Sequence, residues 1–139
     1  MTPDALADIH RQCFTTPRPW RAEEFVELLD LDSVFLCPRP NGFIVGRIAG
    51  PEVELLTLAV DPGERRKGTG KLLLMEFEKA ALSRGAEDAF LEVSDANTAA
   101  ITLYRSFGYR ESGVRKDYYL SSSGKRSSAF VMTRRLVSG

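Results

Sequence analysis

Before residue 30, apolar side chains recur every three or four positions, which is the period of an amphipathic helix. Thr2-Pro3-Asp4 is a typical helix start, and the segment Thr15–Pro19 interrupts the pattern. The spacing predicts two helices, one ending near Cys13 and one covering Trp20 to Leu29. Their apolar faces contain Leu6, Ile9, His10 and Cys13 in the first helix, and Phe25, Leu28 and Leu29 in the second.

From residue 33 the chain changes to short apolar runs that are rich in β-branched and aromatic residues. Turn residues separate these runs at Pro38–Asn41 and at Gly50-Pro51. Such a sequence is typical of consecutive hairpins. It predicts an antiparallel meander of three strands: Ser33–Cys37, Gly42–Ala49 and Glu52–Val60.

The second half of the chain alternates between the two periods. A long helix is expected from about Gly68 to Arg84, with Gly85 at the position after its end, where glycine is favoured. The elements expected after it are a strand at Glu87–Ser94, a short helix at Asn97–Ser106, and strands at Tyr109–Leu120 and Ser127–Leu136 joined by a turn at Ser121–Gly124. We therefore predict an α/β (α+β) protein with a mostly antiparallel mixed sheet flanked by helices, in a single domain of residues 1–139.

Composition narrows the class of protein. The 139 residues suit one domain, and 19 basic residues balance 19 acidic ones, so nothing global favours nucleic-acid or membrane binding. Without a long apolar run or a signal peptide at Met1–His10, a cytoplasmic location is expected. Cys13 and Cys37 are interpreted as small buried side chains rather than a disulfide or a nucleophile. The lone His10 offers no partner ligands, so no metal is predicted.

A loop rich in glycine and basic residues lies between the third predicted strand and the long helix. It contains the spacing Arg65-x-x-Gly68-x-Gly70. Such a loop can present several backbone N–H groups and the positive end of a helix dipole to one anion, and its glycines let the backbone approach closely. It is not a Walker motif, because no Lys-Ser or Lys-Thr follows the second glycine, and the third glycine of the dinucleotide fingerprint is missing. We predict a pyrophosphate ligand.

That spacing resembles the acetyl-CoA signature of the GNAT superfamily of N-acetyltransferases. A more specific resemblance lies in residues 91–109, where Leu-Glu-Val, Asn and Leu-Tyr-x-x-x-Gly-Tyr elements occur in order at the spacing of the RimI-type branch. Enzymes of this branch acetylate the N-terminal alanine of a small-subunit ribosomal protein. Pro19-Trp20 and Asp117-Tyr118-Tyr119 also resemble branch elements, although Arg18 stands where the branch usually has phenylalanine.

The resemblance runs from about Ile9 to Leu136 and implies the GNAT fold. Family members normally begin with a strand before the first helix, and Met1 leaves no room for one. We therefore expect either a sheet without its first strand or a sequence that starts late.

The resemblance also implies a role for each matching residue, with acetyl-CoA as the cosubstrate and no metal. Glu92 would be the general base, and Tyr104 the general acid beside the cofactor. Trp20, Tyr118 and Tyr119 would border the acceptor. The implied cofactor contacts are the backbone of Leu58, Ala59 and Val60, the pyrophosphate loop of Arg65, Arg66, Lys67, Gly68, Thr69, Gly70 and Lys71, and Asn97 against pantetheine.

The chemistry of amine acetylation is consistent with these roles. A free α-amino group has a pKa near 7.7–8.0 and is mostly protonated at neutral pH, so a base such as a partly desolvated Glu92 assists attack. The leaving thiolate needs a proton, which the Tyr104 hydroxyl can donate, and a backbone N–H near Leu58–Val60 can stabilise the oxyanion. The alternatives are an exposed strand glutamate for Glu92, and core side chains for Tyr104 and Trp20.

We therefore predict an acetyl-CoA-dependent N-acetyltransferase, an acyltransferase that modifies the N-terminal α-amine of a protein, alanine first, such as a small-subunit ribosomal protein. We expect a monomer or weak dimer with no nucleic-acid or membrane partner. The alternatives are acetylation of a lysine side chain or a small amine, such as a polyamine or an antibiotic, and a non-catalytic acyl-CoA-binding regulator. Retention of both Glu92 and Tyr104 speaks against the regulator.

Overall fold

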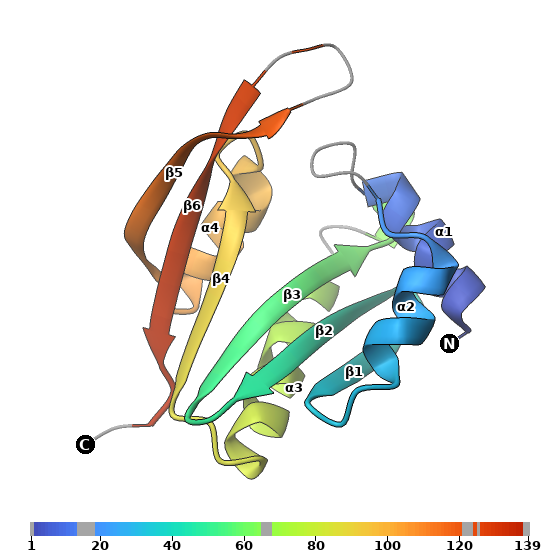
Figure 1. Cartoon of the computed structure of the whole chain (residues 1–139), viewed down its shortest axis with the longest axis horizontal. Coiled ribbons are helices and arrows are strands. Elements are labelled where there is room, and N and C mark those ends of the chain that lie inside the picture. The colour runs from blue at the N-terminus through green and yellow to red at the C-terminus, as the bar shows by residue number, and fades with distance from the viewer. Residues whose placement is uncertain (1, 14–18, 65–67, 121–123, 125, 138–139) are drawn as a thin grey trace.

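The fold is a six-stranded mixed sheet with helices on both faces (Figure 1). The computed structural model describes the chain except for residues 1, 14–18, 65–67, 121–123, 125 and 138–139. The helices are α1 (Pro3–Cys13), α2 (Ala22–Leu29), α3 (Thr69–Ser83) and α4 (Thr98–Ser106), with a short 3₁₀ turn at Pro62–Glu64. The strands are β1 (Val34–Arg39), β2 (Gly42–Ala49), β3 (Glu52–Val60), β4 (Asp88–Ser94), β5 (Arg110–Leu120) and β6 (Arg126–Arg135).

The strand order is β1-β2-β3-β4-β6-β5. β3 and β4 run parallel, and every other neighbouring pair is antiparallel. Parallel strands need a long crossover connection, and here α3 supplies it. The predicted antiparallel meander of the first three strands and the mixed, mostly antiparallel sheet are confirmed.

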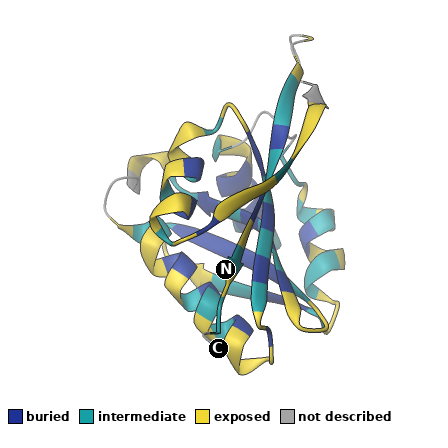
Figure 2. Cartoon of the chain, turned by 90° about the vertical axis from the view of Figure 1, so that its left-hand side faces the viewer, coloured by how far each residue is buried: buried dark blue, intermediate teal, exposed yellow. Residues whose placement is uncertain are grey.

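Two hydrophobic clusters lie on opposite faces of the sheet. The larger one joins α3 and α4 to the sheet and includes Leu73, Phe77 and Leu91, while the smaller one, under α1 and α2, includes Leu6 and Phe25. Figure 2 shows the buried residues along the strands and on the inward sides of the helices. α1 and α2 cover the β1–β3 side of their face, so the same face of β4, β6 and β5 is not covered by a helix (Figure 1).

Most predicted boundaries hold within one or two residues. The Thr2 hydroxyl accepts a hydrogen bond from the Ala5 N–H (3.1 Å), so Pro3 is the first residue of α1, where its missing N–H costs nothing. At the other predicted cap, Gly85 has φ 91°, a conformation that favours glycine. α3 is the longest described helix at 15 residues, and no helix in the described ranges is long and apolar enough to cross a bilayer.

Two predicted boundaries differ by two residues. Pro38 lies within β1 rather than in a turn, because β1 is an edge strand, where proline can be accommodated. Trp20 precedes α2, which begins at Ala22 after the cap residue Arg21. In the described part of the chain the first strand is β1, after both N-terminal helices. The predicted turn at Ser121–Gly124 falls mostly outside the described residues.

Candidate active site

β3 and β4 separate halfway along their length. They pair from Glu52 with Asp88 to Leu55 with Leu91, and the pairing ends there, although β3 continues to Val60 and β4 to Ser94 (Figure 1). Beyond that point β3 pairs only with β2, and β4 only with β6. Backbone N–H and C=O groups require hydrogen-bond partners, so the facing edges of the two strands can take a ligand between them.

A β-bulge explains why the strands separate. Gly46 of β2 pairs with Leu55 and Val45 pairs with Thr57, so Leu56 is an extra residue in β3. A bulge bends its strand and increases the local twist. Leu55 packs in the cluster under α3, whereas Leu56 packs in the cluster under α1 and α2. The bend therefore lies where the parallel pairing to β4 stops.

The start of α3 lies beyond the end of β3. Gly68 is its cap residue with φ 80°, a left-handed conformation. Among the described residues beyond its chain neighbours, no atom lies within 4 Å of the position that a Cβ would occupy. A Cβ on Gly70 would lie 3.1 Å from Leu103 Cδ2, so the first turn of α3 packs closely on α4. Lys71 is exposed. The predicted anion-binding residues Arg65, Arg66 and Lys67 lie outside the described residues.

Glu92 lies on β4 just past the point where β3 departs. Its side chain is 26% exposed, and its Oε1 is 3.2 Å from Nη2 of Arg115 on β5. Leu91 and Val93 are buried in the cluster under α3 and α4, and Glu92 occupies the opposite face. The predicted alternation along this strand is confirmed, and it places a half-buried carboxylate at the open end of the sheet.

Tyr104 is buried on the other side of β4. It projects from α4 into the larger cluster, with its ring centroid 5.8 Å from that of Tyr109. Burial raises the pKa of the Tyr104 hydroxyl well above its usual value, so this hydroxyl keeps its proton at neutral pH. The structure therefore gives Tyr104 a core contact, and its predicted role as general acid stays a prediction.

Asn97 caps α4. Its Oδ1 accepts a hydrogen bond from the Ala100 N–H (3.2 Å), which satisfies one of the donors that a helix start leaves unpaired. This capping hydrogen bond explains why asparagine occurs at position 97 even if the residue binds no ligand. The predicted contact with pantetheine stays a prediction.

Trp20 is held against β3 through His10. The Trp20 backbone N–H donates to His10 Nδ1 (3.0 Å), and the two rings stack 5.1 Å apart. Because Nδ1 accepts, Nε2 carries the proton of the neutral ring and donates to Thr57 Oγ1 (2.9 Å), just past the bulge. Burial lowers the pKa of His10 to about 4, against a smaller opposing effect of Glu24. Sequence reasoning placed His10 on the apolar face of the first helix and predicted no metal there, but it missed this role.

Arg115 on β5 contacts Glu92, and Tyr118 of the same strand contacts Arg115. The Arg115 guanidinium carbon is 5.3 Å from the centroid of the half-exposed Tyr118 ring. The structure thus brings Glu92 and Tyr118 together through Arg115, a residue that sequence reasoning did not select. The side chain of Tyr119, the other predicted aromatic, lies outside the described residues.

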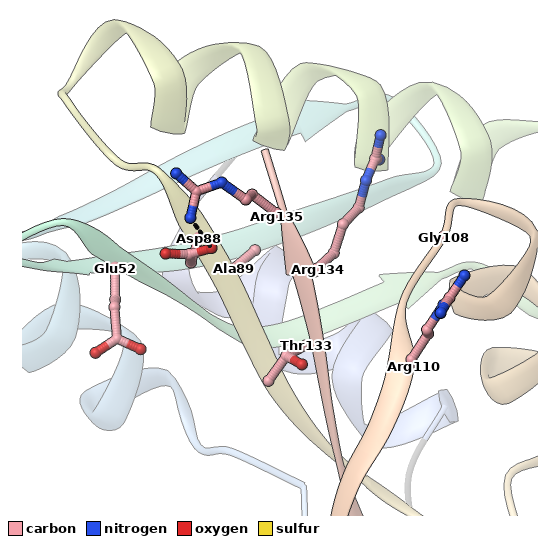
Figure 3. A pocket seen from close by; sticks show the side chains of 8 residues that line it. All are labelled: Glu52, Asp88, Ala89, Gly108, Arg110, Thr133, Arg134 and Arg135. Carbon is pink, nitrogen blue, oxygen red and sulfur yellow. Dashed lines mark ion pairs between the residues drawn. The ribbon is translucent and has the colours of Figure 1, made fainter. Parts of the chain in front are cut away.

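A polar pocket of about 470 Å³ lies at the other end of β4, where β3 and β4 are still paired (Figure 3). It contains none of the predicted site residues. The pocket is lined by side chains of both charge signs, and two of them, Arg135 and Asp88, form an ion pair at 3.9 Å. The lining residues are Glu52, Asp88, Ala89, Gly108, Arg110, Thr133, Arg134 and Arg135. Separately, no group of three or more His, Cys, Asp or Glu side chains in the described ranges could hold a metal ion.

The chain belongs to the acetyltransferase (GNAT) family, whose model matches residues 4–109. N-alpha-acetyltransferase RimI of Mycobacterium tuberculosis (strain H37Rv) is 34% identical over 137 residues, covering 92% of this chain and 83% of that protein. The ribosomal protein bS18 alanine N-acetyltransferase of Escherichia coli (strain K12) is 37% identical over 90 residues, covering 65% of this chain. That match spans only 60% of the length of the E. coli protein.

A solved structure shows the same fold. The crystal structure of the ribosomal-protein-S18-alanine N-acetyltransferase from Escherichia coli superposes with a TM-score of 0.86 at 27% identity. The superposition covers 99% of this chain and 89% of that one. The predicted family and fold are therefore confirmed.

Proposed function

We propose that this protein is an acetyl-CoA-dependent N-acetyltransferase that acetylates the N-terminal α-amine of a protein, with alanine preferred. The observation that carries the proposal is the half-buried Glu92 at the open end of the β3–β4 pair, in a chain that belongs to the GNAT family. The similarity to alanine N-acetyltransferases that act on ribosomal protein S18 supports a protein N-terminus, such as that of a small-subunit ribosomal protein, as the acceptor.

Acetyl-CoA fits the features of this end of the sheet. The edge of β3 from Leu58 to Val60 lacks a partner strand on the β4 side and can hydrogen-bond an extended amide chain, as pantetheine is. Gly68, with open space where a side chain would be, begins the helix whose first N–H groups can bind the pyrophosphate. We assign Thr69, Gly70 and the basic side chains of the loop to the same pyrophosphate-binding site.

Glu92 and Tyr104 divide the proton transfers between them. The Glu92 carboxylate accepts a proton from the acceptor ammonium, directly or through water, and the neutral amine attacks the acetyl carbonyl carbon. A backbone N–H of the β3 edge stabilises the oxyanion. As the C–N bond forms and the C–S bond breaks, the attacking nitrogen loses its second proton to solvent. The Tyr104 hydroxyl donates a proton to the departing sulfur and is reprotonated from solvent.

The acceptor preference follows from the same chemistry. A lysine amine has a pKa near 10.4, compared with 7.7–8.0 for an α-amine, so a far smaller fraction of it is neutral at pH 7. A single carboxylate base therefore deprotonates an N-terminal α-amine more readily than a lysine side chain. Trp20 and Tyr118 are our candidates for the walls that contact the first side chain.

The proposal is tested with purified protein, acetyl-CoA and three matched peptides. The first begins with alanine, the second with leucine, and the third has a blocked terminus and an internal lysine; a polyamine serves as a small-amine control. We expect the highest kcat/KM for the alanine peptide. Equal rates on the blocked peptide would replace the N-terminal acceptor by a side chain, and no turnover with any amine would reject an enzymatic function.

A further inference from the structure

Arg115 occupies the space between two residues of the proposed site. Its Nη2 is 3.2 Å from Oε1 of Glu92, and its guanidinium carbon is 5.3 Å from the Tyr118 ring. β6 lies between β5 and β4, so the Arg115 side chain crosses a strand to reach Glu92. It does so over small or apolar residues, because Ala129 pairs with Arg115 and Val131 pairs with Glu92.

A bulge in β5 builds this arrangement. Between the Arg115–Ala129 and Tyr119–Ser127 pairs β5 advances four residues while β6 advances two, so β5 carries two extra residues. Asp117 sits in this bulge with φ 53°, a strained conformation for a non-glycine residue. Its N–H donates to Ser128 Oγ (3.4 Å). The bulge breaks the strict alternation of strand side chains and lets Tyr118 lie against Arg115.

Stability does not explain the Arg115–Glu92 pair. The Arg115 side chain is 56% exposed, and ion pairs of this kind contribute little, roughly 1 kcal/mol at most. A strained bulge that places an aromatic ring against the cation paired with the proposed base points instead to a role in the reaction. This step rests on the proposed function, because it takes Glu92 as the group that receives the acceptor proton.

We propose that Arg115 is a positioning residue for acetyl transfer: it holds the Glu92 carboxylate in place and favours the neutral form of the acceptor amine through its positive charge. A base must lie about 2.6–3.2 Å from the nitrogen it deprotonates, directly or through one water. With Arg115 within 3.2 Å of the same carboxylate, the two cations come within about 6 Å of one another. Like charges at that distance disfavour ionisation.

Few other charges act on this pair. Among the described residues, the neighbouring charges are Asp95 after β4, Lys116 and Asp117 after Arg115, and Arg126 on β6, whose Nη1 donates to the Asp117 carbonyl (3.4 Å). None of these four forms an ion pair with a partner in the described part of the chain. Among the described residues, Tyr118 is a further titratable group in contact with Arg115. The acceptor amine would therefore respond mainly to Glu92 and Arg115.

The test is the pH dependence of kcat for Arg115→Gln and Arg115→Lys at saturating acetyl-CoA, with the alanine peptide from pH 6 to 10. The acid limb of kcat reports groups in the bound complex. Removing the cation raises the pKa of the bound amine, so for Arg115→Gln the limb should move up by about one pH unit. kcat at pH 7 should then fall about tenfold, and it should converge with wild type at high pH. Arg115→Lys, which keeps the charge, should stay close to wild type.

Arg47→Gln is the matched control. Arg47 pairs with Glu54 at 2.6 Å in the closed part of the same sheet, with similar exposure of both side chains. Its removal should leave the kcat profile unchanged, and thermal unfolding should show that both variants are folded.

An Arg115→Gln profile identical to wild type, or a loss of equal size at every pH, would overturn the inference. Neither result touches the proposed function, which wild-type turnover tests separately. If wild type prefers the internal lysine, the same comparison is made with that amine.

Discussion

Glu54 and Glu92 are two half-buried carboxylates on strands of one sheet, each paired with an arginine from another strand. Their side chains are 25% and 26% exposed. Glu54 lies where β3 is paired on both sides, between the Glu52–Asp88 and Leu55–Leu91 pairs, which we call the closed end. Glu92 lies at the open end, where β4 has lost β3 as its neighbour. The two carboxylates are similarly buried and each is paired with an arginine, so the difference that we use lies in the strand edge beside each carboxylate.

This difference separates a structural pair from a candidate base. At the closed end the backbone is saturated by strand pairing, so no substrate can reach Glu54 through the sheet. At the open end the edges of β3 and β4 remain available, and the bulge at Leu56 is what separates them. An ion pair alone therefore identifies no candidate site in this fold, whereas an ion pair beside an interrupted strand pairing does.

The largest effect is expected from Glu92→Gln, with Glu54→Gln as its matched control. Glu92→Gln should lower kcat about 10²–10⁴-fold, since a general base contributes that much, and should leave acetyl-CoA affinity nearly unchanged. The loss should shrink as rising pH deprotonates the acceptor unaided. Steady-state kinetics and calorimetric titration measure both quantities.

Glu54→Gln should retain wild-type turnover. Equal losses in the two variants would show that an exposed ion pair matters wherever it lies, and would remove the distinction between the ends. Wild-type turnover by Glu92→Gln at pH 7 would remove Glu92 from the mechanism.

The next largest effect concerns His10, which joins α1 to the open end through Thr57. The folded protein keeps His10 neutral with a pKa of about 4, whereas the unfolded chain protonates it near 6.5. The unfolded state thus binds more protons between these values, so His10 contributes its full stability above pH 6.5 and loses it as pH falls toward 4. The free energy of unfolding should drop by about 2 kcal/mol from pH 6.5 to 5.

Denaturant titrations of wild type and His10→Gln across this range measure the effect. The variant should be less stable than wild type at pH 7.5, but its free energy of unfolding should change less with pH. An equal slope in both proteins would assign the pH dependence to other groups.

The sequence predicted the elements well because their periods are local. Alternation placed Leu91 and Glu92 on opposite faces of β4, and the caps at Thr2 and Gly85 fixed helix ends. Features that depend on register were not visible. The bulge at Leu56 lies in an apolar run. A one-residue shift in strand register leaves the pattern of apolar and polar residues there unchanged.

Long-range contacts were hidden for a similar reason. His10 and Thr57 are 47 residues apart, and no local signal links them. Arg115 reaches Glu92 across β6, and the bulge that brings Tyr118 beside it contains Asp117, where a positive φ usually indicates glycine. Resemblance to the family selected Glu92 and Tyr118 from their motifs, but not the arginine between them.

A smaller effect is expected at Gly68, whose matched control is Gly85 at the other end of α3. Both glycines have left-handed φ, 80° and 91°, and at both the described residues leave open space at the Cβ position, so valine strains the backbone similarly at either site. Gly68→Val should also weaken acetyl-CoA binding about tenfold, because its side chain fills space that the pyrophosphate needs. Gly85→Val should lower the melting temperature without changing affinity. Equal affinities in two folded variants would place the pyrophosphate elsewhere.

The smallest effect is expected at Tyr118, which shares the open end with Glu92 but lies at its rim, half exposed. If its ring crowds the first side chain of the acceptor, Tyr118→Ala should relax the preference for alanine over leucine about three- to tenfold. The expected effect is small because a hydrophobic wall distinguishes only weakly between side chains that differ by a few methylene groups. Val114→Ala is the control, because Val114 is equally exposed on the same strand and pairs with Phe130, away from Glu92. The ratio of kcat/KM for the two peptides is the measurement, because it cancels any change in the chemical step common to both. If the ratio is unchanged in Tyr118→Ala but shifted in Trp20→Ala, then Trp20, which His10 holds against β3, contacts the first side chain of the acceptor instead of Tyr118.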